Sequence, residues 1–514
     1  MRTDYSIKNS ITSFVGNIIT FTFAFVGQIL FIRILGVEYN GLNGLFNNVL
    51  TILNLFELGI GTSITYNLYK YVKNNNKEII KSIMQFYKKS YYYIALIVFI
   101  VGLLLMPFLS YIVKVTVNIN LYVIYLLFLI NTASVYFVSY KRNLLVASQK
   151  NYIINIVNIG YVVILNIVQI LILYLTKNYY IYLIIKIICA ILENIIISII
   201  VNKMYPYMLE KNIKPLNKNI KKNITNRVKA LIIHKTSATV TNGTDNILIS
   251  IFLGITTVGI YTNYNYIISA IKKLFSNIIS NLIPSIGNLL VEDNKEKNYQ
   301  TFKKIKFLNI WITTFTSTCL LLLIEPVIEL FIGKSYILDK AVLIVLIINY
   351  FQTMMRNNFA TFKDAGGIWV EDKYVPLIQL SINLISSIIL LKLMGLKGVF
   401  VGTILSSLVL WFYSYPKFVY KKLFNKKIVD YYKEMFTTLI ICFSIIIFVY
   451  ITANIYKFNS LLSELIITTL ICVLLPNLLL YMVFRKTNEY NYYRNLIRQK
   501  IKQYKSERRK SNYH

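Results

Sequence analysis

The sequence is poor in the side chains from which catalytic and metal sites are usually built. Its 514 residues include two histidines and four cysteines, and no two cysteines have the C-x-x-C spacing. Neither a disulfide framework nor a metal centre is therefore expected. The motifs G-x-x-x-x-G-K-[ST], G-x-G-x-x-G and D-x-D are also missing, which argues against nucleotide hydrolysis by this chain. We expect a protein that is not an enzyme and needs no cofactor.

Charged residues are scarce as well, at 15% of the chain. A soluble protein carries roughly 25%. Hydrophobic residues make up 56% and the mean hydropathy is +0.58. Apolar runs long enough to cross a bilayer core of about 30 Å recur along the whole chain. The N-terminal apolar segment has no cleavage site of the signal-peptide kind, so it is predicted to remain as a first helix. The sequence predicts an all-α, polytopic membrane protein.

We predict fourteen transmembrane helices from these runs. Their approximate ranges are 11–34, 41–69, 91–113, 119–140, 152–176, 179–202, 228–254, 259–290, 305–332, 337–362, 374–394, 396–416, 434–456 and 460–484.

Acidic residues are few, 21 against 55 basic ones, which gives a net charge of +34. Such an excess can mark nucleic-acid binding, but here the lysines and arginines lie in the connections between helices. We assign the basic connections to the cytoplasm, namely 1–10, 70–90, 141–151, 203–229, 292–306, 356–373, 417–433 and 485–514. That side then holds 43 of the 55 lysines and arginines, and the opposite side holds seven. The positive-inside rule then places both termini in the cytoplasm, and no nucleic-acid partner is expected. The outer connections are too short to form a folded domain, which argues against a polysaccharide polymerase or a membrane glycosyltransferase.

An internal repeat is visible at an offset of about 218 residues. The segment "LGVEYNGLNGLFN" at 35–47 matches "LGITTVGIYTNYN" at 253–265, which aligns Gly41 with Gly259 and Asn47 with Asn265. Six predicted spans separate the copies. An even number of spans preserves orientation, so the sequence predicts two parallel lobes of six helices each, an architecture typical of transporters.

This repeat predicts the domain boundaries. We expect an N-terminal lobe at 1–203, a cytoplasmic linker at 204–227 and a C-terminal lobe at 228–420. Helices 13 and 14 follow at 421–484, and a basic cytoplasmic tail at 485–514.

A polar stripe runs along the second predicted helix. The residues Asn43, Asn47, Thr51, Asn54, Glu57, Gly61 and Thr65 follow one another at spacings of three or four, so they share one helical face. Lipid does not tolerate such a face, which must contact protein or a water-filled cavity. Helix packing through small and amide residues accounts for part of the stripe. It does not account for the carboxylate of Glu57.

The repeat places the eighth predicted helix at the equivalent position of the second lobe. Its polar face includes Asn265, Ser269 and Lys272, with Lys273 alongside. Because Asn54 maps to Lys272, we hypothesise that Glu57 and Lys272 lie within one helical turn of each other in depth, on opposite sides of a central cavity. Glu57 would pair with Lys272 or Lys273 in one state and release the cation to an anionic substrate in another.

Further polar groups lie on other predicted spans. The seventh predicted helix carries Lys235, Asn242, Asp245 and Asn246. Arg33 stands near the outer end of the first and either faces the cavity or extends to the interface. On the sixth, Lys186 and Glu193 are expected to form a structural pair. Cations and amides at these depths suit a large, hydroxylated, negatively charged cargo, such as a sugar chain on a lipid diphosphate.

Three segments resemble a known family: "FIRILGVEYNGLNGLF" (31–46), "FELGIGTSITYNLYK" (56–70) and "TDNILISIFLGITTVGIYTNYNYI" (244–267). They are similar to the polysaccharide repeat-unit flippases of the multidrug/oligosaccharidyl-lipid/polysaccharide exporter superfamily. The resemblance implies two bundles that work by alternating access. It also implies a location in the bacterial cytoplasmic membrane, with an undecaprenyl-diphosphate-linked oligosaccharide as cargo that is moved to the outer leaflet for capsular or other surface polysaccharide. Cationic cavity residues of such proteins hold the diphosphate, which here implies Lys272, Lys273, Lys235 and Arg33.

Three other functions compete with this one. A cation-coupled drug exporter and a peptidoglycan-precursor flippase belong to the same superfamily, and a non-transporting scaffold would use the basic tail to recruit partners. The transport cycle could reset through a proton or Na⁺ at Glu57 or Asp245, or through the membrane potential alone. Anionic lipids are expected partners of the tail. A polysaccharide polymerase and a chain-length regulator are candidate partners.

Overall fold

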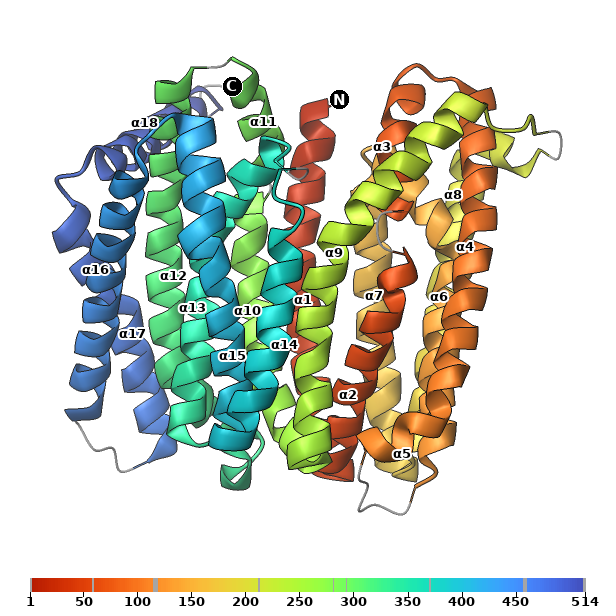
Figure 1. Ribbon diagram of the computed structural model, residues 1–514, viewed down its shortest axis with the longest axis horizontal. Coiled ribbons are helices and arrows are strands. Elements are labelled where there is room, and N and C mark those ends of the chain that lie inside the picture. Colours follow the sequence, from red (N-terminus) through yellow and green to blue (C-terminus); the bar gives the residue numbers. More distant parts are fainter. Residues whose placement is uncertain are drawn as a thin grey trace. The chain divides into compact units, whose positions relative to one another are not determined.

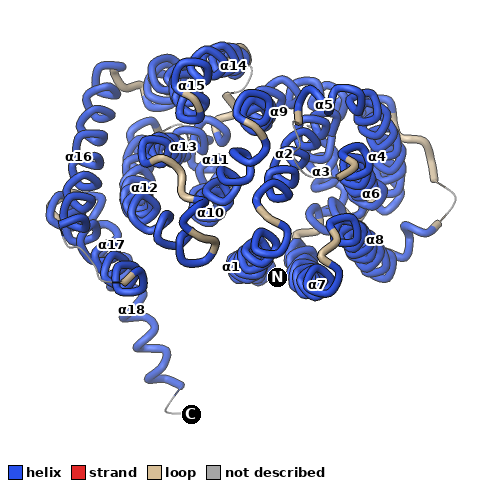
Figure 2. The backbone as a smooth tube through the Cα atoms, turned by 90° about the horizontal axis from the view of Figure 1, so that it is seen from below, coloured by secondary structure: helices blue, strands red, loops and turns tan. Residues whose placement is uncertain are grey.

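The computed structural model describes residues 2–57, 60–113, 119–210, 213–280, 282–292, 294–368, 371–455 and 460–511. All regular elements in these ranges are helices joined by short loops (Figures 1 and 2). A helix covers each of the fourteen predicted spans. The prediction of an all-α membrane protein is therefore confirmed.

Ten helices in the described ranges are long and apolar enough to cross a membrane. The remaining four predicted spans correspond to the α2–α3 segment, α9, α10 and α13, which are interrupted or more polar. These four include the helices to which the polar stripes were assigned. Length and hydropathy of the described residues thus set these four apart from the ten candidate membrane spans.

The chain forms two compact units. Unit 1 comprises residues 1–263 and 376–402, and unit 2 comprises 264–375 and 403–514. Helices α10 and α15 each begin in unit 1 and continue into unit 2. The lobe boundaries drawn from the repeat stay a prediction.

Unit 1 is built mainly from long helices whose starts are capped by asparagine. The side chains of Asn76, Asn120 and Asn178 accept hydrogen bonds from backbone amides in the first turns of α4, α6 and α8. The helices of this unit are α1 (Arg2–Leu35), α2 (Val37–Leu53), η1 (Asn54–Glu57), α3 (Ile60–Lys73), α4 (Lys77–Leu105), η2 (Met106–Phe108), α5 (Leu109–Ile112), α6 (Leu121–Ala147), α7 (Asn151–Thr176), α8 (Tyr179–Met204), η3 (Pro206–Leu209), α9 (Lys218–Leu253), the start of α10 (Ile255–Ser280), most of α14 (Val375–Met394) and the start of α15 (Leu396–Val409).

The second predicted span is not one continuous helix. It ends as α2 at Leu53, tightens into the 3₁₀ turn η1, and resumes as α3 at Ile60. Glu57 is the last residue of η1. The expectation of a single helix over 41–69 is wrong, because hydropathy and periodicity carry no signal for a change from α to 3₁₀ winding. In transporters, interrupted spans of this kind line binding sites.

Unit 2 is centred on α12, against which α13, α16 and α17 pack. Leu322, Ile445, Val449, Cys472 and Leu480 form a buried apolar cluster among α12, α16 and α17. The helices of this unit are the rest of α10, α11 (Ile283–Val291), α12 (Lys295–Phe331), η4 (Lys334–Tyr336), α13 (Lys340–Ala365), the rest of α15, the π-helical segment η5 (Leu410–Leu423), α16 (Ile428–Ile455), α17 (Leu461–Phe484) and α18 (Asn488–Ser511).

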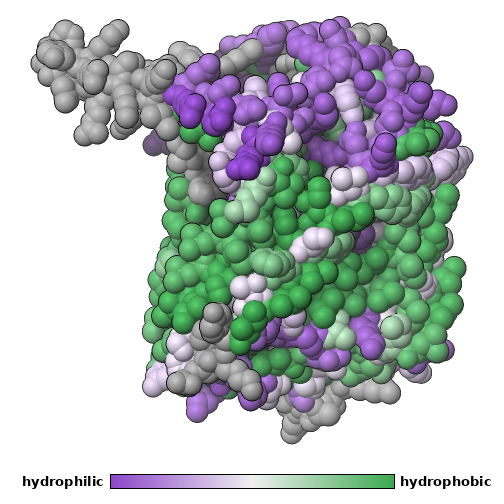
Figure 3. All heavy atoms as spheres, turned by 90° about the vertical axis from the view of Figure 1, so that its left-hand side faces the viewer, coloured by the Kyte–Doolittle hydropathy of each residue, from purple (hydrophilic) through white to green (hydrophobic). Residues whose placement is uncertain are grey.

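The surface on the side of α16 and α17 matches a bilayer. Figure 3 shows a continuous hydrophobic band on this side, with a hydrophilic cap at one end. Exposed apolar side chains on the two helices include Ile440, Ile447, Phe448, Leu470 and Leu474. The chain is a multi-pass membrane protein.

Candidate functional site

Glu57 lies at the interruption of the second span and is held by a chain of tyrosines. Its Oε1 accepts a hydrogen bond of 2.6 Å from the hydroxyl of Tyr91 on α4. The Tyr91 hydroxyl accepts in turn from Tyr87 at 3.2 Å, and Tyr87 accepts from the amide of Asn143 on α6. Tyr87 and Tyr91 are almost completely buried. The carboxylate is thus fixed by neutral donors within unit 1.

Two other residues of the predicted stripe behave differently. Asn54 on η1 accepts a hydrogen bond of 2.5 Å from Tyr136 on α6. Asn47 is exposed, and its carbonyl accepts the hydroxyl of Thr51. The stripe therefore turns from exposed to half-buried at the end of α2, where the tyrosines of α4 and α6 meet it.

A tight helix crossing lies at the start of α2. A Cβ added at Gly41 would clash with the carbonyl oxygen of Ile255, and one added at Gly259 would clash with that of Val37. The two glycines that the repeat aligns are therefore in contact. Asn40 strengthens the crossing, because its amide donates to the Gly259 carbonyl at 2.9 Å and to Asn263 at 3.0 Å. Such contacts need residues without side chains.

The predicted stripe on α9 is only partly described. Asp245 is half-buried, and its Oδ1 has no hydrogen-bond partner among the described groups. Asn246 is 3% exposed and approaches Gly44 on α2, beside which α9 lies (Figures 1 and 2). The side chains of Lys235 and Asn242 lie outside the described residues.

Two cations of unit 2 interact electrostatically. Lys272 on α10 is half-buried, and its charge repels that of Arg356 on α13. Within the described part of the chain, neither has a carboxylate at ion-pair distance. Arg356 donates through Nη2 to Thr353 at 3.3 Å, whereas its buried Nε has no partner among the described groups.

Neutral polar groups accompany this pair. One turn after Lys272, the hydroxyl of Ser276 accepts a hydrogen bond of 2.9 Å from the Asn357 amide. Lys272, Ser276, Thr353, Arg356 and Asn357 form what we call the cation site. Two unneutralised charges at the depth of membrane helices are costly, and this makes them functional candidates for binding an anion. Guanidinium and ammonium groups are suited to phosphate oxygens.

The other predicted residues lie near helix ends or on exposed faces. Lys273 is exposed, and Ser269 donates to the side chain of Asn265 at 3.2 Å. Arg33 is exposed in the last turn of α1. Glu57 belongs to unit 1 and Lys272 to unit 2, and their proposed pairing stays a prediction.

The expected pairing of Lys186 with Glu193 is wrong. Glu193 on α8 instead forms a 3.0 Å ion pair with Arg142 on α6, which also donates to Asn194. Lys186 lies over the ring of Phe128, 5.1 Å from its centroid. Arg142 was missed because the charges at 141–151 were assigned to a connection, whereas α6 continues to Ala147.

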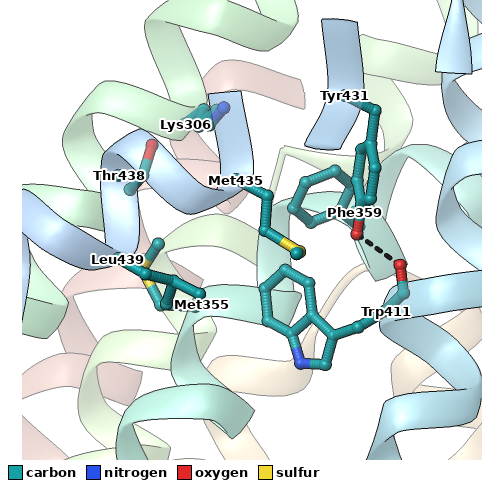
Figure 4. A pocket seen from close by; sticks show the side chains of 8 residues that line it. All are labelled: Lys306, Met355, Phe359, Trp411, Tyr431, Met435, Thr438 and Leu439. Carbon is teal, nitrogen blue, oxygen red and sulfur yellow. Dashed lines mark hydrogen bonds between the residues drawn. The ribbon is translucent and has the colours of Figure 1, made fainter. Parts of the chain in front are cut away.

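A hollow in unit 2 is too small to be a substrate site. Met355, Phe359, Trp411, Tyr431 and Met435 are among the side chains that line it, and the Tyr431 hydroxyl donates to the Trp411 carbonyl at 2.8 Å (Figure 4). Its volume of about 10 Å³ has room for one water molecule at most. Lys306, at its edge, is paired with Glu434 at 2.8 Å. This region stabilises the bundle.

Arg356 and the tyrosines around Glu57 are functional candidates that the sequence did not single out. Arg356 was counted with the connection 356–373, but α13 extends to Ala365. Tyr87, Tyr91 and Tyr136 are three of 42 tyrosines, so their residue type alone did not distinguish them. The spacing of four residues between Tyr87 and Tyr91 was the available signal for these two.

Solved structures with a similar fold include membrane transporters. The lipid II flippase MurJ in an inward closed conformation has a TM-score of 0.64 at 16% identity, covering 93% of this chain and 99% of that chain. A multidrug resistance MATE family transporter of the MOP superfamily, in an inward-facing conformation, has a TM-score of 0.60 at 15% identity, covering 76% of this chain and 91% of that chain. A variant of the Vibrio cholerae MATE transporter VcmN has a TM-score of 0.58 at 12% identity, covering 83% of this chain and 99% of that chain.

Sequence comparisons identify the family. Comparison with curated proteins finds no match. The family model described as "Polysaccharide biosynthesis protein" matches residues 6–290, more than half of the chain. The segments from which the resemblance was inferred lie within this range. The chain thus belongs to the polysaccharide biosynthesis protein family, and its fold is that of the MOP superfamily transporters.

Proposed function

We propose that this protein is a flippase that moves a diphosphate-linked lipid oligosaccharide across the bacterial cytoplasmic membrane by alternating access. It acts as a carrier and leaves the covalent structure of its cargo unchanged. The family match supports a role in polysaccharide biosynthesis. The similarity to MATE and MurJ structures supports a transporter fold.

The cation site carries the proposal. Lys272 and Arg356 supply two positive charges without a neighbouring carboxylate, and a lipid diphosphate supplies two negative ones. Arg356 offers an unused donor, and charge-assisted hydrogen bonds to phosphate are about twice as strong as neutral ones. A cationic drug would meet repulsion at this position.

The site addresses the main barrier to transport, which is the charged headgroup. Moving it bare through about 30 Å of hydrocarbon is prohibitive. A cavity that binds the diphosphate on one side and opens to the other removes most of that barrier, while the lipid tail stays in the bilayer. A membrane potential that is negative inside favours outward movement of an anion by about 2.3 kcal/mol per charge for each 100 mV.

The test is transport of a fluorescent polyprenyl-diphosphate oligosaccharide in proteoliposomes that contain the full-length protein. Lys272→Ala and Arg356→Ala should each slow transport at least about tenfold, from loss of a charge-assisted hydrogen bond. Lys272→Arg keeps the charge and should retain most activity. Lys417→Ala removes an exposed lysine of the same unit and serves as the control.

Competition separates this function from its rivals. Excess polyprenyl diphosphate should inhibit transport, whereas a lipophilic cation should not. Inhibition by the cation alone would overturn the proposal in favour of a drug exporter. Equal transport of a peptidoglycan precursor and an oligosaccharide would show that the diphosphate is recognised without the sugar.

A further inference from the structure

An open groove runs between α4 and α6 in unit 1, apart from the residues discussed above. It holds about 500 Å³ and is lined by Tyr92, Ala95, Leu96, Phe99, Ile130, Ala133, Ser134 and Phe137. Seven of these eight side chains are apolar or aromatic. Ser134 satisfies its hydroxyl within its own helix, by donating to the Asn131 carbonyl at 2.8 Å. The lining therefore offers few hydrogen-bonding groups to water.

The groove exists because small residues form its floor. Ala95 and Ala133 are buried at 3% and 8% exposure, whereas Leu96 and Phe137 stand beside them at 55% and 50%. The large side chains of Leu96 and Phe137 thus project beside a strip of small residues that forms the floor of the groove. A hollow of this size on a lipid-facing surface forfeits dispersion contacts unless something fills it. In a bilayer, that filler is a hydrocarbon chain.

Two lysines stand at one end of the groove. The rings of Tyr92 and Phe137 meet there with centroids 5.5 Å apart. One turn beyond them on each helix lie Lys88 and Lys141. The Lys88 ammonium is 5.7 Å from the centroid of the Tyr92 ring, and its charge repels that of Lys141.

These two lysines have no acidic counterpart. Lys141 donates to Ser198 at 2.5 Å and Asn202 at 2.9 Å, both neutral acceptors. Neither lysine forms an ion pair with a carboxylate of the described residues. A positively charged end and an apolar trough together match an amphipathic anion.

We propose that this groove binds one anionic phospholipid, with its phosphate at Lys88 and Lys141 and one acyl chain between α4 and α6. The trough from Tyr92 to Phe99 spans eight residues, which cover about 10 Å of helix from the first to the last. That is less than half of a bilayer core of about 30 Å. The ligand therefore belongs to a single leaflet.

This dimension favours a resident phospholipid over transported cargo. A cargo lipid must leave the leaflet in which its headgroup starts, whereas the groove ends within that leaflet. The predicted topology places the lysine end at the cytoplasmic surface, where anionic headgroups attract basic residues. The inference is independent of the proposed flippase function.

Native mass spectrometry of the delipidated full-length protein tests this site. Phosphatidylglycerol and phosphatidylcholine with identical chains are added separately. We expect one phosphatidylglycerol to be retained in clear preference to phosphatidylcholine. Lys88→Ala should weaken retention about fivefold, and Ala133→Phe, which fills the groove, should abolish it.

Matched controls make the result decisive. Lys89→Ala removes the adjacent exposed lysine, and Ile188→Phe adds an aromatic ring to an exposed position on α8. Both should bind like the wild type. If Ala133→Phe does not fold, a comparison of lipid retention by Lys88→Ala and Lys89→Ala still tests the site, because both lysines are exposed. Equal retention of the two lipids, equal losses in both lysine variants, or displacement of the adduct only by polyprenyl diphosphate would each overturn the proposal.

Discussion

The hydroxyl of Tyr91 donates a 2.6 Å hydrogen bond to the carboxylate of Glu57, and so ties α4 to the interruption of the second span. Of the described residues, none gives this carboxylate a cation at ion-pair distance. Its position is therefore set by neutral partners, and its charge stays available to an ion or to another part of the chain. This relationship is the structural basis for the first prediction.

Tyr91→Phe should destabilise the protein, because a hydrogen bond to a charged group contributes about 1.5–3 kcal/mol. Thermal unfolding in detergent, followed by tryptophan fluorescence, measures the loss. Tyr93→Phe is the control, since Tyr93 is 67% exposed two residues away. Equal destabilisation by both variants would contradict a specific role for the Tyr91 hydroxyl.

Gly41→Ala and Gly259→Ala should each force α2 and α10 apart at their crossing. An added methyl group meets backbone carbonyl oxygens, which cannot rotate away as a side chain does. Overpacking of this kind costs about 1–3 kcal/mol. Gly160→Ala is the control, because a Cβ there meets nothing within 4 Å. Thermal unfolding should leave Gly160→Ala near the wild type, and a comparable loss in that variant would count against the crossing.

Arg142→Met should be among the most damaging single substitutions in unit 1. It leaves the carboxylate of Glu193, which is 8% exposed, without its cation, and breaking such a pair costs about 3–5 kcal/mol. The double variant Arg142→Met/Glu193→Leu should recover much of the loss, as judged by folded yield and melting temperature. A double variant as poor as the single one would show that the pair does not act as a unit.

Cysteines at positions 57 and 272 should crosslink in at least one state of the transport cycle, in a variant whose four native cysteines are replaced by alanine. The reason is the repeat, which predicts similar depths for Glu57 and Lys272. Mass spectrometry after treatment with a short bifunctional reagent detects the product. Cysteines at 57 and 417 provide the control pair, because Lys417 is an exposed residue of η5 in the segment predicted to face the cytoplasm. If no crosslink between positions 57 and 272 forms under any condition, with or without cargo, the hypothesis that Glu57 and Lys272 approach each other is wrong.

The sequence predicted the helices well and the chemistry of the site only in part. Apolar runs and basic connections locate fourteen helices because bilayer thickness and loop charge act on every segment alike. The same reasoning ends α6 too early and assigns the C-terminal part of α13 to a connection, because it treats charged residues as loop residues. For this reason Arg142 and Arg356 were not recognised as residues of helices. Their positions depend on partners from other helices, such as Glu193 and Lys272, which no local pattern reveals.

The interruption at Glu57 has one local signal, the glycines Gly59 and Gly61 that follow it in the sequence. The change of winding itself goes together with contacts that Tyr91 and Tyr136 make from α4 and α6, which no local pattern reveals. The repeat aligns Gly41 with Gly259, and the structure gives the reason for glycine at both positions, because their helix crossing leaves no room for side chains.

The polarity of α9 has a consequence for biogenesis. Its sequence carries Lys235 and Asp245, and each such charge costs about 2.5–3.5 kcal/mol when a segment leaves the translocon alone. Among the described residues, its apolar stretch Gly243–Leu253 is shorter than the roughly 20 residues that a transmembrane helix needs. Its packing partner α2 is synthesised long before it. Helix α9 is thus expected to leave the translocon only by docking onto helices already in the membrane, which makes assembly of the bundle an ordered process during translation.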